Sequence, residues 1–98
     1  MRVRFTKLAN EDLQQAYQYI VQDSPESARN IIERIKKAIE TLCQYSSLGK
    51  PGRIKGTREF VVSQTPFILV YRQKEETLQI LSVLHTSKKY PHRMSGIF

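Results

Sequence analysis

Phe67-Ile-Leu-Val-Tyr-Arg72 and Leu78-Gln-Ile-Leu-Ser-Val-Leu-His85 are two apolar runs separated only by the short connection 73–77. Runs of this length that are rich in β-branched and aromatic residues predict β-strands, and so short a connection predicts a hairpin. A third run of the same type, Arg58-Glu-Phe-Val-Val62, precedes them across the short link 63–66. The second half of the chain therefore predicts three consecutive antiparallel strands.

The first half of the chain predicts a short strand, around Val3 and Phe5, followed by two helices. Thr6 is a suitable N-cap for the first helix, and Ser24 with Pro25 marks the start of the second. Both predicted helices carry apolar residues at spacings of three and four, which indicates one buried face on each. These residues are Ala9, Leu13, Ala16, Tyr17 and Ile20 in the first helix, and Ala28, Ile31, Ile32, Ile35, Ile39 and Leu42 in the second.

Together these elements predict a single α+β domain over residues 1–98, in the order β-αα-βββ. We expect a helical hairpin to pack on one face of an antiparallel sheet. The strands have apolar residues on both faces, so both faces are expected to be partly buried. Either the C-terminal residues Ile97 and Phe98 or a partner is expected to cover the face without helices. In the last strand, alternation predicts one face with Leu81, Val83 and His85, and another with Ile80, Ser82 and Leu84.

Positive charge is concentrated in the second half of the chain. Residues 1–49 contain seven Lys/Arg and six Asp/Glu, a balance of 7 − 6 = +1, whereas residues 50–98 contain nine and three, a balance of 9 − 3 = +6. A basic face of this kind attracts phosphate backbones, anionic membranes or acidic proteins. The alternative is a merely solvated surface.

Several classes of protein are disfavoured by composition. No apolar stretch approaches the ~20 residues that a membrane-spanning helix needs, and the first residues lack the apolar segment of a secretory signal. Cys43 is the only cysteine, which excludes an internal disulfide and a cysteine-rich metal site. We therefore expect a cytoplasmic protein.

Several segments resemble the RelE/ParE toxin superfamily, and the resemblance covers nearly the whole chain. In the second half they are Gly52-Arg-Ile-Lys-Gly-Thr-Arg-Glu-Phe-Val-Val62, Pro66-Phe-Ile-Leu-Val-Tyr-Arg72 and Ile80-Leu-Ser-Val-Leu-His85. In the first half they are Glu11-Asp-Leu13, Tyr19-Ile20 and Ser24-Pro-Glu-Ser-Ala28. The resemblance implies the toxin of a type II toxin–antitoxin system. It also implies a cognate antitoxin, a small and often acidic protein that wraps the toxin.

Members of this superfamily differ in function. RelE-like toxins enter the ribosomal A site and cut mRNA without a metal, whereas ParE-like toxins share the fold and inhibit DNA gyrase. The resemblance does not choose between them. Our first hypothesis is a ribosome-dependent mRNA endonuclease, our second is a non-enzymatic inhibitor of gyrase, and our third is an inactive module that mainly binds its antitoxin.

Metal-free RNA cleavage needs a base for the 2′-hydroxyl proton, cations for the phosphate and an acid for the leaving oxygen. His85 ends the last predicted strand, and an imidazole suits either proton role. Arg58 and Arg72 lie on neighbouring strands and are expected to clamp the phosphate with their forked donors. These three residues are the predicted catalytic group. The predicted phosphate-binding and base-stacking residues are Arg53, Lys55, Lys88, Lys89 and Tyr90.

Each of these residues also has a purely structural interpretation. His85 can close the strand with a hydrogen bond, and Arg58 can pair with a carboxylate such as Glu59. Lys88 and Lys89 can be a solvated pair, and Tyr90 an anchor for the chain end. Neither histidine, His85 or His92, has an accompanying set of metal ligands, so no metal and no cofactor are expected.

Overall fold

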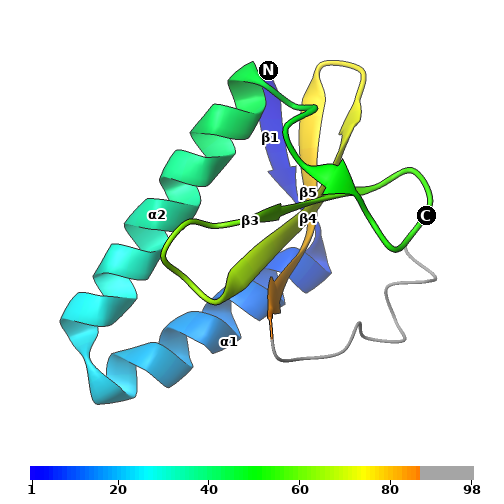
Figure 1. Ribbon diagram of the computed structural model, residues 1–98. Helices are drawn as coiled ribbons and strands as arrows, with labels where there is room; N and C mark the ends of the chain where they lie inside the picture. Colours follow the sequence, from blue (N-terminus) through cyan, green and yellow to red (C-terminus); the bar gives the residue numbers. More distant parts are fainter. Residues whose placement is uncertain (87–98) are drawn as a thin grey trace.

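The computed structural model describes residues 1–86, which form a sheet of five strands and two helices (Figure 1). The α+β class and the predicted order of one strand, two helices and three strands are confirmed, and one short strand is added. The elements are β1 (Arg2–Phe5), α1 (Lys7–Asp23), α2 (Pro25–Gln44), β2 (Lys50–Pro51), β3 (Arg58–Val61), β4 (Phe67–Lys74) and β5 (Thr77–His85).

The sheet has the strand order β1-β5-β4-β3-β2. Strands β2 to β5 are antiparallel to their neighbours, but β1 runs parallel to β5, with Val3 opposite Leu78 and Phe5 opposite Ile80. The prediction of a wholly antiparallel sheet is therefore wrong at this edge, and the sheet is mixed. Alternation of apolar residues defines the two faces of a strand, but it does not specify which strand an isolated strand joins or in which direction.

The two helices meet at Ser24 and diverge from it as a V beside the sheet (Figure 1). Ser24 serves both helices, because its backbone N–H donates to the Ile20 carbonyl while its side chain accepts from the Ser27 N–H. Thr6 is the N-cap of α1, and its side chain accepts from the Ala9 N–H at 3.1 Å. Both predicted helix starts are confirmed.

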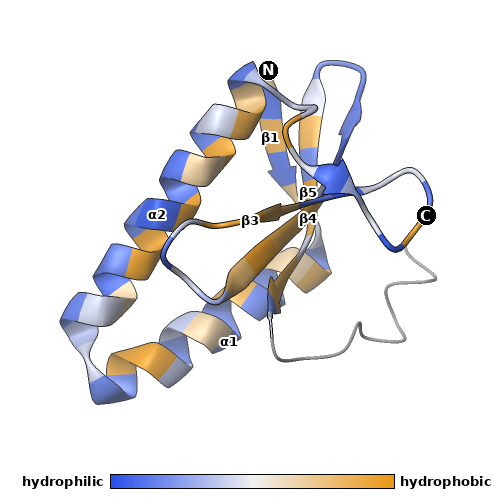
Figure 2. Ribbon diagram, viewed as in Figure 1, coloured by the Kyte–Doolittle hydropathy of each residue, from blue (hydrophilic) through white to orange (hydrophobic). Residues whose placement is uncertain are grey.

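Apolar residues are buried on both sides of the sheet, as the sequence predicted, and the middle of the sheet is apolar (Figure 2). The main cluster, between sheet and helices, has Ile35 and Leu42 of α2 packed near Leu69 and Tyr71 of β4. On the opposite face, which we call the second face, a smaller cluster is partly covered by Ile54. The C-terminal residues Ile97 and Phe98, which were one candidate to cover this face, lie outside the described residues. The second cluster consists of Leu8, Val70, Leu81 and Leu84, with Ile54 and Ile68 packed against it.

A β-bulge in β5 changes the predicted alternation. Val70 lies opposite Ser82 and Tyr71 lies opposite Ile80, so Leu81 is an extra residue in β5. A bulge of this kind lets residues that are three apart share a face. As a result, Ile80 and Val83 belong to the main cluster while Leu81 belongs to the second. The predicted separation of Ile80 from Val83 is wrong for this reason.

The outer edge of β5 is completed by polar groups at the start of α1. Strand β1 pairs with β5 only as far as Ile80. Beyond that point the Thr6 hydroxyl donates to the Leu81 carbonyl at 2.8 Å, and the Asp12 carboxylate accepts from the Val83 N–H at 3.1 Å and from the Ser82 hydroxyl. Because an exposed strand edge carries unpaired backbone groups, these contacts take the place of a further strand.

A second polar network holds the chain after α2 against β4. The fully buried Tyr71 hydroxyl donates to the Ser46 carbonyl at 2.6 Å and accepts from the Gly49 N–H at 2.9 Å. Gly49 allows this approach, because a Cβ there would lie 2.6 Å from the Tyr71 oxygen. Burial raises the pKa of Tyr71, whereas the Gly49 N–H and the nearby Arg58 charge oppose that rise.

We expect Asp12→Ala to lower the free energy of unfolding by about 1.5–3 kcal/mol, because it leaves the buried Val83 N–H without its charged acceptor. Asp12→Asn keeps one acceptor oxygen and is expected to cost less. Urea unfolding of both variants measures the loss, and Gln15→Ala, at an exposed position of the same helix, is the control. A loss for Asp12→Ala no larger than that of the control would contradict this role.

We expect Tyr71→Phe to destabilise the fold by about 1–3 kcal/mol at neutral pH, because the Ser46 carbonyl and Gly49 N–H lose their partner. The Tyr71 pKa is higher in the folded than in the unfolded chain, so its stabilisation is complete below the unfolded value of about 10 and is lost as pH rises through the folded value. The stability difference between wild type and Tyr71→Phe should therefore shrink at high pH.

Urea unfolding of both proteins at several pH values between neutral and about 11 measures this difference. The control is Tyr19→Phe, because Tyr19 is 74% exposed and its hydroxyl should contribute less than about 0.5 kcal/mol. A wild-type advantage that stays constant across this pH range would be inconsistent with a titrating Tyr71.

Candidate functional site

His85, the predicted proton-transfer residue, is the last residue of β5 and lies opposite Phe67 of β4. It is half-buried, and its ring meets the Phe67 ring edge to face, with centroids 5.5 Å apart and an interplanar angle of 86°. Phe67 belongs to the main cluster, so the register places His85 on the helix-covered face. The imidazole is thus oriented by an aromatic neighbour at one end of the sheet.

Arg58, the predicted phosphate clamp, is the first residue of β3 and lies opposite Tyr71. Its Nη1 donates to the Gly49 carbonyl at 2.7 Å and lies 3.4 Å from the Ser47 carbonyl. Arg58 therefore helps Tyr71 to hold residues 46–49, the segment that follows α2. This structural role differs from the predicted pairing with a carboxylate.

The fold places His85 and Arg58 at different positions along the sheet. Along β4 their partners Phe67 and Tyr71 are four residues apart, and the two residues lie on opposite sides of that strand. At ~3.3 Å per residue and ~4.8 Å between strands, their Cα atoms are about 16 Å apart. Acid–base and phosphate-binding groups must meet at one phosphate, whereas here the Arg58 guanidinium binds the Gly49 carbonyl and the His85 ring packs against Phe67. Their individual roles stay predictions.

Arg72, the third predicted catalytic residue, lies on the second face. It is adjacent in β4 to Tyr71, which faces the helices, and its Nε donates to the Gln79 side chain at 2.7 Å. Gln79 is also the register partner of Arg4 in β1. Sequence reasoning did not single out Arg4, although the alternation of Arg2 and Arg4 with Val3 and Phe5 was a signal for it.

Arg53 and Lys55 lie in the segment between β2 and β3. The Arg53 guanidinium forms an ion pair with Glu59 at 3.3 Å, and its backbone N–H donates to the same carboxylate at 3.0 Å. Glu59 is 4% exposed, so this pair anchors the segment to the second face. Lys55 is exposed. The other predicted phosphate-binding and stacking residues, Lys88, Lys89 and Tyr90, lie outside the described residues.

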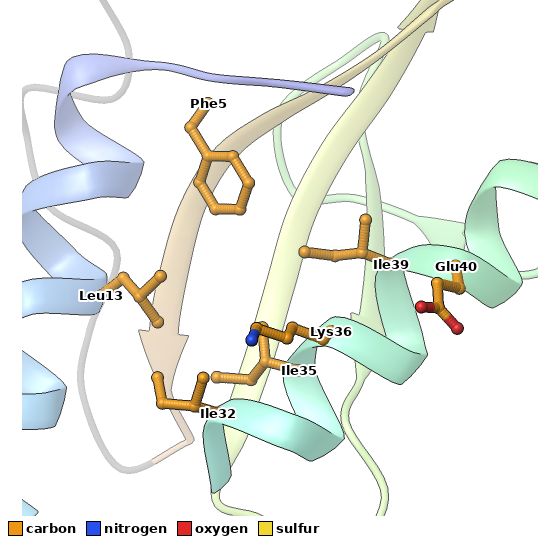
Figure 3. Close-up of a pocket in the computed structure, with 7 residues that line it drawn as sticks. All are labelled: Phe5, Leu13, Ile32, Ile35, Lys36, Ile39 and Glu40. Atoms are coloured by element: carbon orange, nitrogen blue, oxygen red, sulfur yellow. The ribbon is translucent and has the colours of Figure 1, made fainter. Parts of the chain in front are cut away.

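An apolar groove lies between α1 and α2, on the side of the sheet opposite to the second face (Figure 3). It has a volume of about 370 Å³, and Phe5, Leu13 and Ile39 converge on it. A neighbouring hollow of about 330 Å³ shares two of its residues, Leu13 and Ile32. Apolar walls of this kind suit apolar side chains of another protein better than a charged substrate.

Residues 1–86 contain neither a cluster of metal ligands nor a membrane-spanning helix. No group of three or more His, Cys, Asp or Glu residues in this part of the chain is arranged to hold a metal ion. Neither helix in this part of the chain is long and apolar enough to cross a bilayer.

Comparison with known proteins shows which family this chain is similar to. The family described as "ParE toxin of type II toxin-antitoxin system, parDE" matches residues 3–90. Y4kP of Sinorhizobium fredii, a protein named as a toxin, is 38% identical over 90 residues, which cover 92% of this chain and 93% of Y4kP.

Solved structures agree with this assignment. A chain of the chromosomal ParDE toxin–antitoxin system from P. aeruginosa has a TM-score of 0.74 and 27% identity, covering 87% of this chain and 95% of that one. YafQ from E. coli has the same fold, with a TM-score of 0.55 and 16% identity over 89% of this chain and 96% of its own. The chain belongs to the ParE toxin family of type II toxin–antitoxin systems.

Proposed function

We propose that this toxin stops growth by binding DNA gyrase and does not itself cut nucleic acid. The observation that supports this proposal is the hydrogen bond from Arg58 to the Gly49 carbonyl at 2.7 Å, which engages this arginine at a position four residues along β4 from the partner of His85. The resemblance to ParE-like toxins supplies the target. The order of our two leading hypotheses from the sequence is therefore reversed.

The argument against cleavage rests on how the predicted catalytic group is used in the fold. Arg58 donates to the carbonyls of the 46–49 segment, and Arg72 donates to Gln79 on the other face of the sheet. Moving Arg58 to a phosphate beside His85 would leave the Gly49 carbonyl without this donor. A general acid or base must lie within hydrogen-bond reach of the group that it serves.

An inhibitor that binds a protein needs a complementary surface instead of an acid–base centre. The groove between α1 and α2 has this character, because it is open and apolar and two charged residues, Lys36 and Glu40, border it. Apolar patches with a polar border are typical of protein-binding sites.

Membership of the ParE family implies a cognate antitoxin as the chain's natural partner. We propose that this antitoxin is small and acidic and wraps the toxin, as the family resemblance implies. The net charge of +7 supports an acidic partner, because opposite charges speed encounter and suppress wrong partners. We further propose that both proteins act in the cytoplasm.

Ribosome-dependent mRNA cleavage is the second candidate function. One observation favours it: His85 is partly accessible at the end of β5, where the chain continues into Lys88, Lys89 and Tyr90. In this alternative, His85 would act with those residues and without Arg58.

The test compares two assays on the same purified full-length protein. In the first assay, we expect the protein to inhibit the DNA supercoiling that purified gyrase catalyses. In the second, the protein is added to translating ribosomes, and we expect primer extension to show an intact message. His85→Ala should inhibit gyrase within about twofold of wild type, because no proton transfer is involved.

The matched variant is Arg58→Ala, which should remain folded in a thermal melt before its inhibition is compared. Cuts inside codons that disappear in His85→Ala would replace this proposal with the mRNA endonuclease. Cuts that persist in both variants would overturn it as well, and would place the catalytic group elsewhere in the chain.

A further inference from the structure

We propose that the second face carries a site for the phosphate backbone of duplex DNA, formed by Arg2 and Arg4 of β1 with Arg72 and Lys74 of β4. We call this set of four cations the basic ridge. It lies on the sheet, away from the groove between the helices. The proposal goes beyond gyrase inhibition and does not depend on it.

The register of the sheet aligns the basic ridge. One row across strands β1, β5 and β4 consists of Arg4, Gln79 and Arg72, each opposite the next. A second row, two residues away along the strands, consists of Arg2, Thr77 and Lys74. Partners that lie opposite each other in a sheet point to the same face. The chain neighbours of these residues show which face this is. Phe5, Leu78 and Tyr71 pack in the main cluster on the helix side. Because neighbouring residues in a strand point to opposite faces, the cations lie on the second face.

The ridge is compact and partly accessible. Arg2, Arg4 and Lys74 are exposed, and Arg72 is half-buried and oriented by its hydrogen bond to Gln79. Arg4 and Arg72 are two strand spacings apart, or about 10 Å between Cα atoms. A duplex carries one negative charge per ~1.7 Å of its axis, so a ridge of this width spans several phosphates.

Most acidic residues of the chain lie on elements away from the basic ridge. Six of its nine Asp and Glu residues lie on α1 and α2, and Glu59 forms an ion pair with Arg53. Glu75 and Glu76 lie in the turn between β4 and β5, next to Lys74. Within the ridge, the Arg4–Gln79–Arg72 row is the one farther from these two carboxylates, so it is where we expect an external anion to bind.

The side chains between the cations distinguish among anionic partners. Thr77 and Gln79 are polar, so the ridge has no apolar centre of the kind that anchors a protein interface. Among residues 1–86, no aromatic residue lies between the cations in the register, whereas single-strand binders stack bases on aromatic rings. Arg, Lys, Thr and Gln are the residues that contact phosphates in duplex complexes. Sequence-independent binding of duplex DNA fits this composition best.

The test measures binding of purified full-length protein to a fluorescent 20-base-pair duplex of arbitrary sequence by anisotropy, over a series of salt concentrations. The logarithm of the association constant falls with the logarithm of salt by about 0.9 for each phosphate contact. We therefore expect Arg2→Gln combined with Arg4→Gln to reduce this slope by about 1–2 and to weaken binding equally for unrelated sequences.

The matched control is Arg29→Gln combined with Arg34→Gln, which removes the same charge from exposed positions of α2. This control should reduce the slope of the salt dependence by less than about half of the reduction seen for the Arg2/Arg4 variant, because Arg29 and Arg34 do not belong to the ridge. Thermal melts check that each variant folds. If the β1 variant does not, Arg72→Gln combined with Lys74→Gln serves in its place and should show the same reduction in slope.

Three outcomes would overturn the proposal. One is an equal loss of slope in the ridge and control variants, which would indicate only a general effect of net charge. Another is binding of a 20-nucleotide single strand as tightly as the duplex. The third is unchanged DNA binding by ridge variants that bind the cognate antitoxin more weakly, which would make the ridge a protein interface.

Discussion

The structure depends on how the outer edge of β5 is completed. This strand lies inside the sheet, but β1 covers only its first half, and the backbone of the second half would otherwise be exposed at an edge. Thr6 and Asp12 of α1 bind that backbone directly. The same contacts fix the first helix against the sheet, so the position of the helical layer follows from a backbone requirement as well as from apolar packing.

The arrangement of the candidate residues follows from this frame. Because β4 lies between β3 and β5, residues at the start of β3 and at the end of β5 are held far apart. Arg58 is used to secure the segment after α2, where Tyr71 is the buried centre of the network. A basic residue that looks catalytic in the sequence is therefore partly accounted for by structure, which favours an inhibitor that acts by binding.

Two surfaces of opposite character result, one on each side of the sheet. The helix side has an apolar groove, and the second face has the basic ridge, in which Arg72 donates to Gln79. The groove is suited to protein partners and the basic ridge to phosphates, since protein interfaces need an apolar centre while phosphate contacts need cations and polar donors. A protein in the groove and a duplex on the basic ridge would therefore occupy opposite sides of the sheet and would not compete for the same surface.

Local chemistry made much of this fold predictable from the sequence. Helix starts at Thr6 and Ser24 depend on neighbouring residues only, and the runs that became β3, β4 and β5 were evident from their composition. The charge of the second half was likewise visible in the sequence. The tertiary structure decided the features that depend on distant partners. These are the parallel pairing of β1, the bulge at Leu81, the ion pair of Arg53 with Glu59, and the separation of His85 from Arg58. Each of these features depends on how residues from different parts of the chain are placed relative to one another. The sequence does not predict that placement, because strand pairing and side-chain partners are selected by packing and not by local preference.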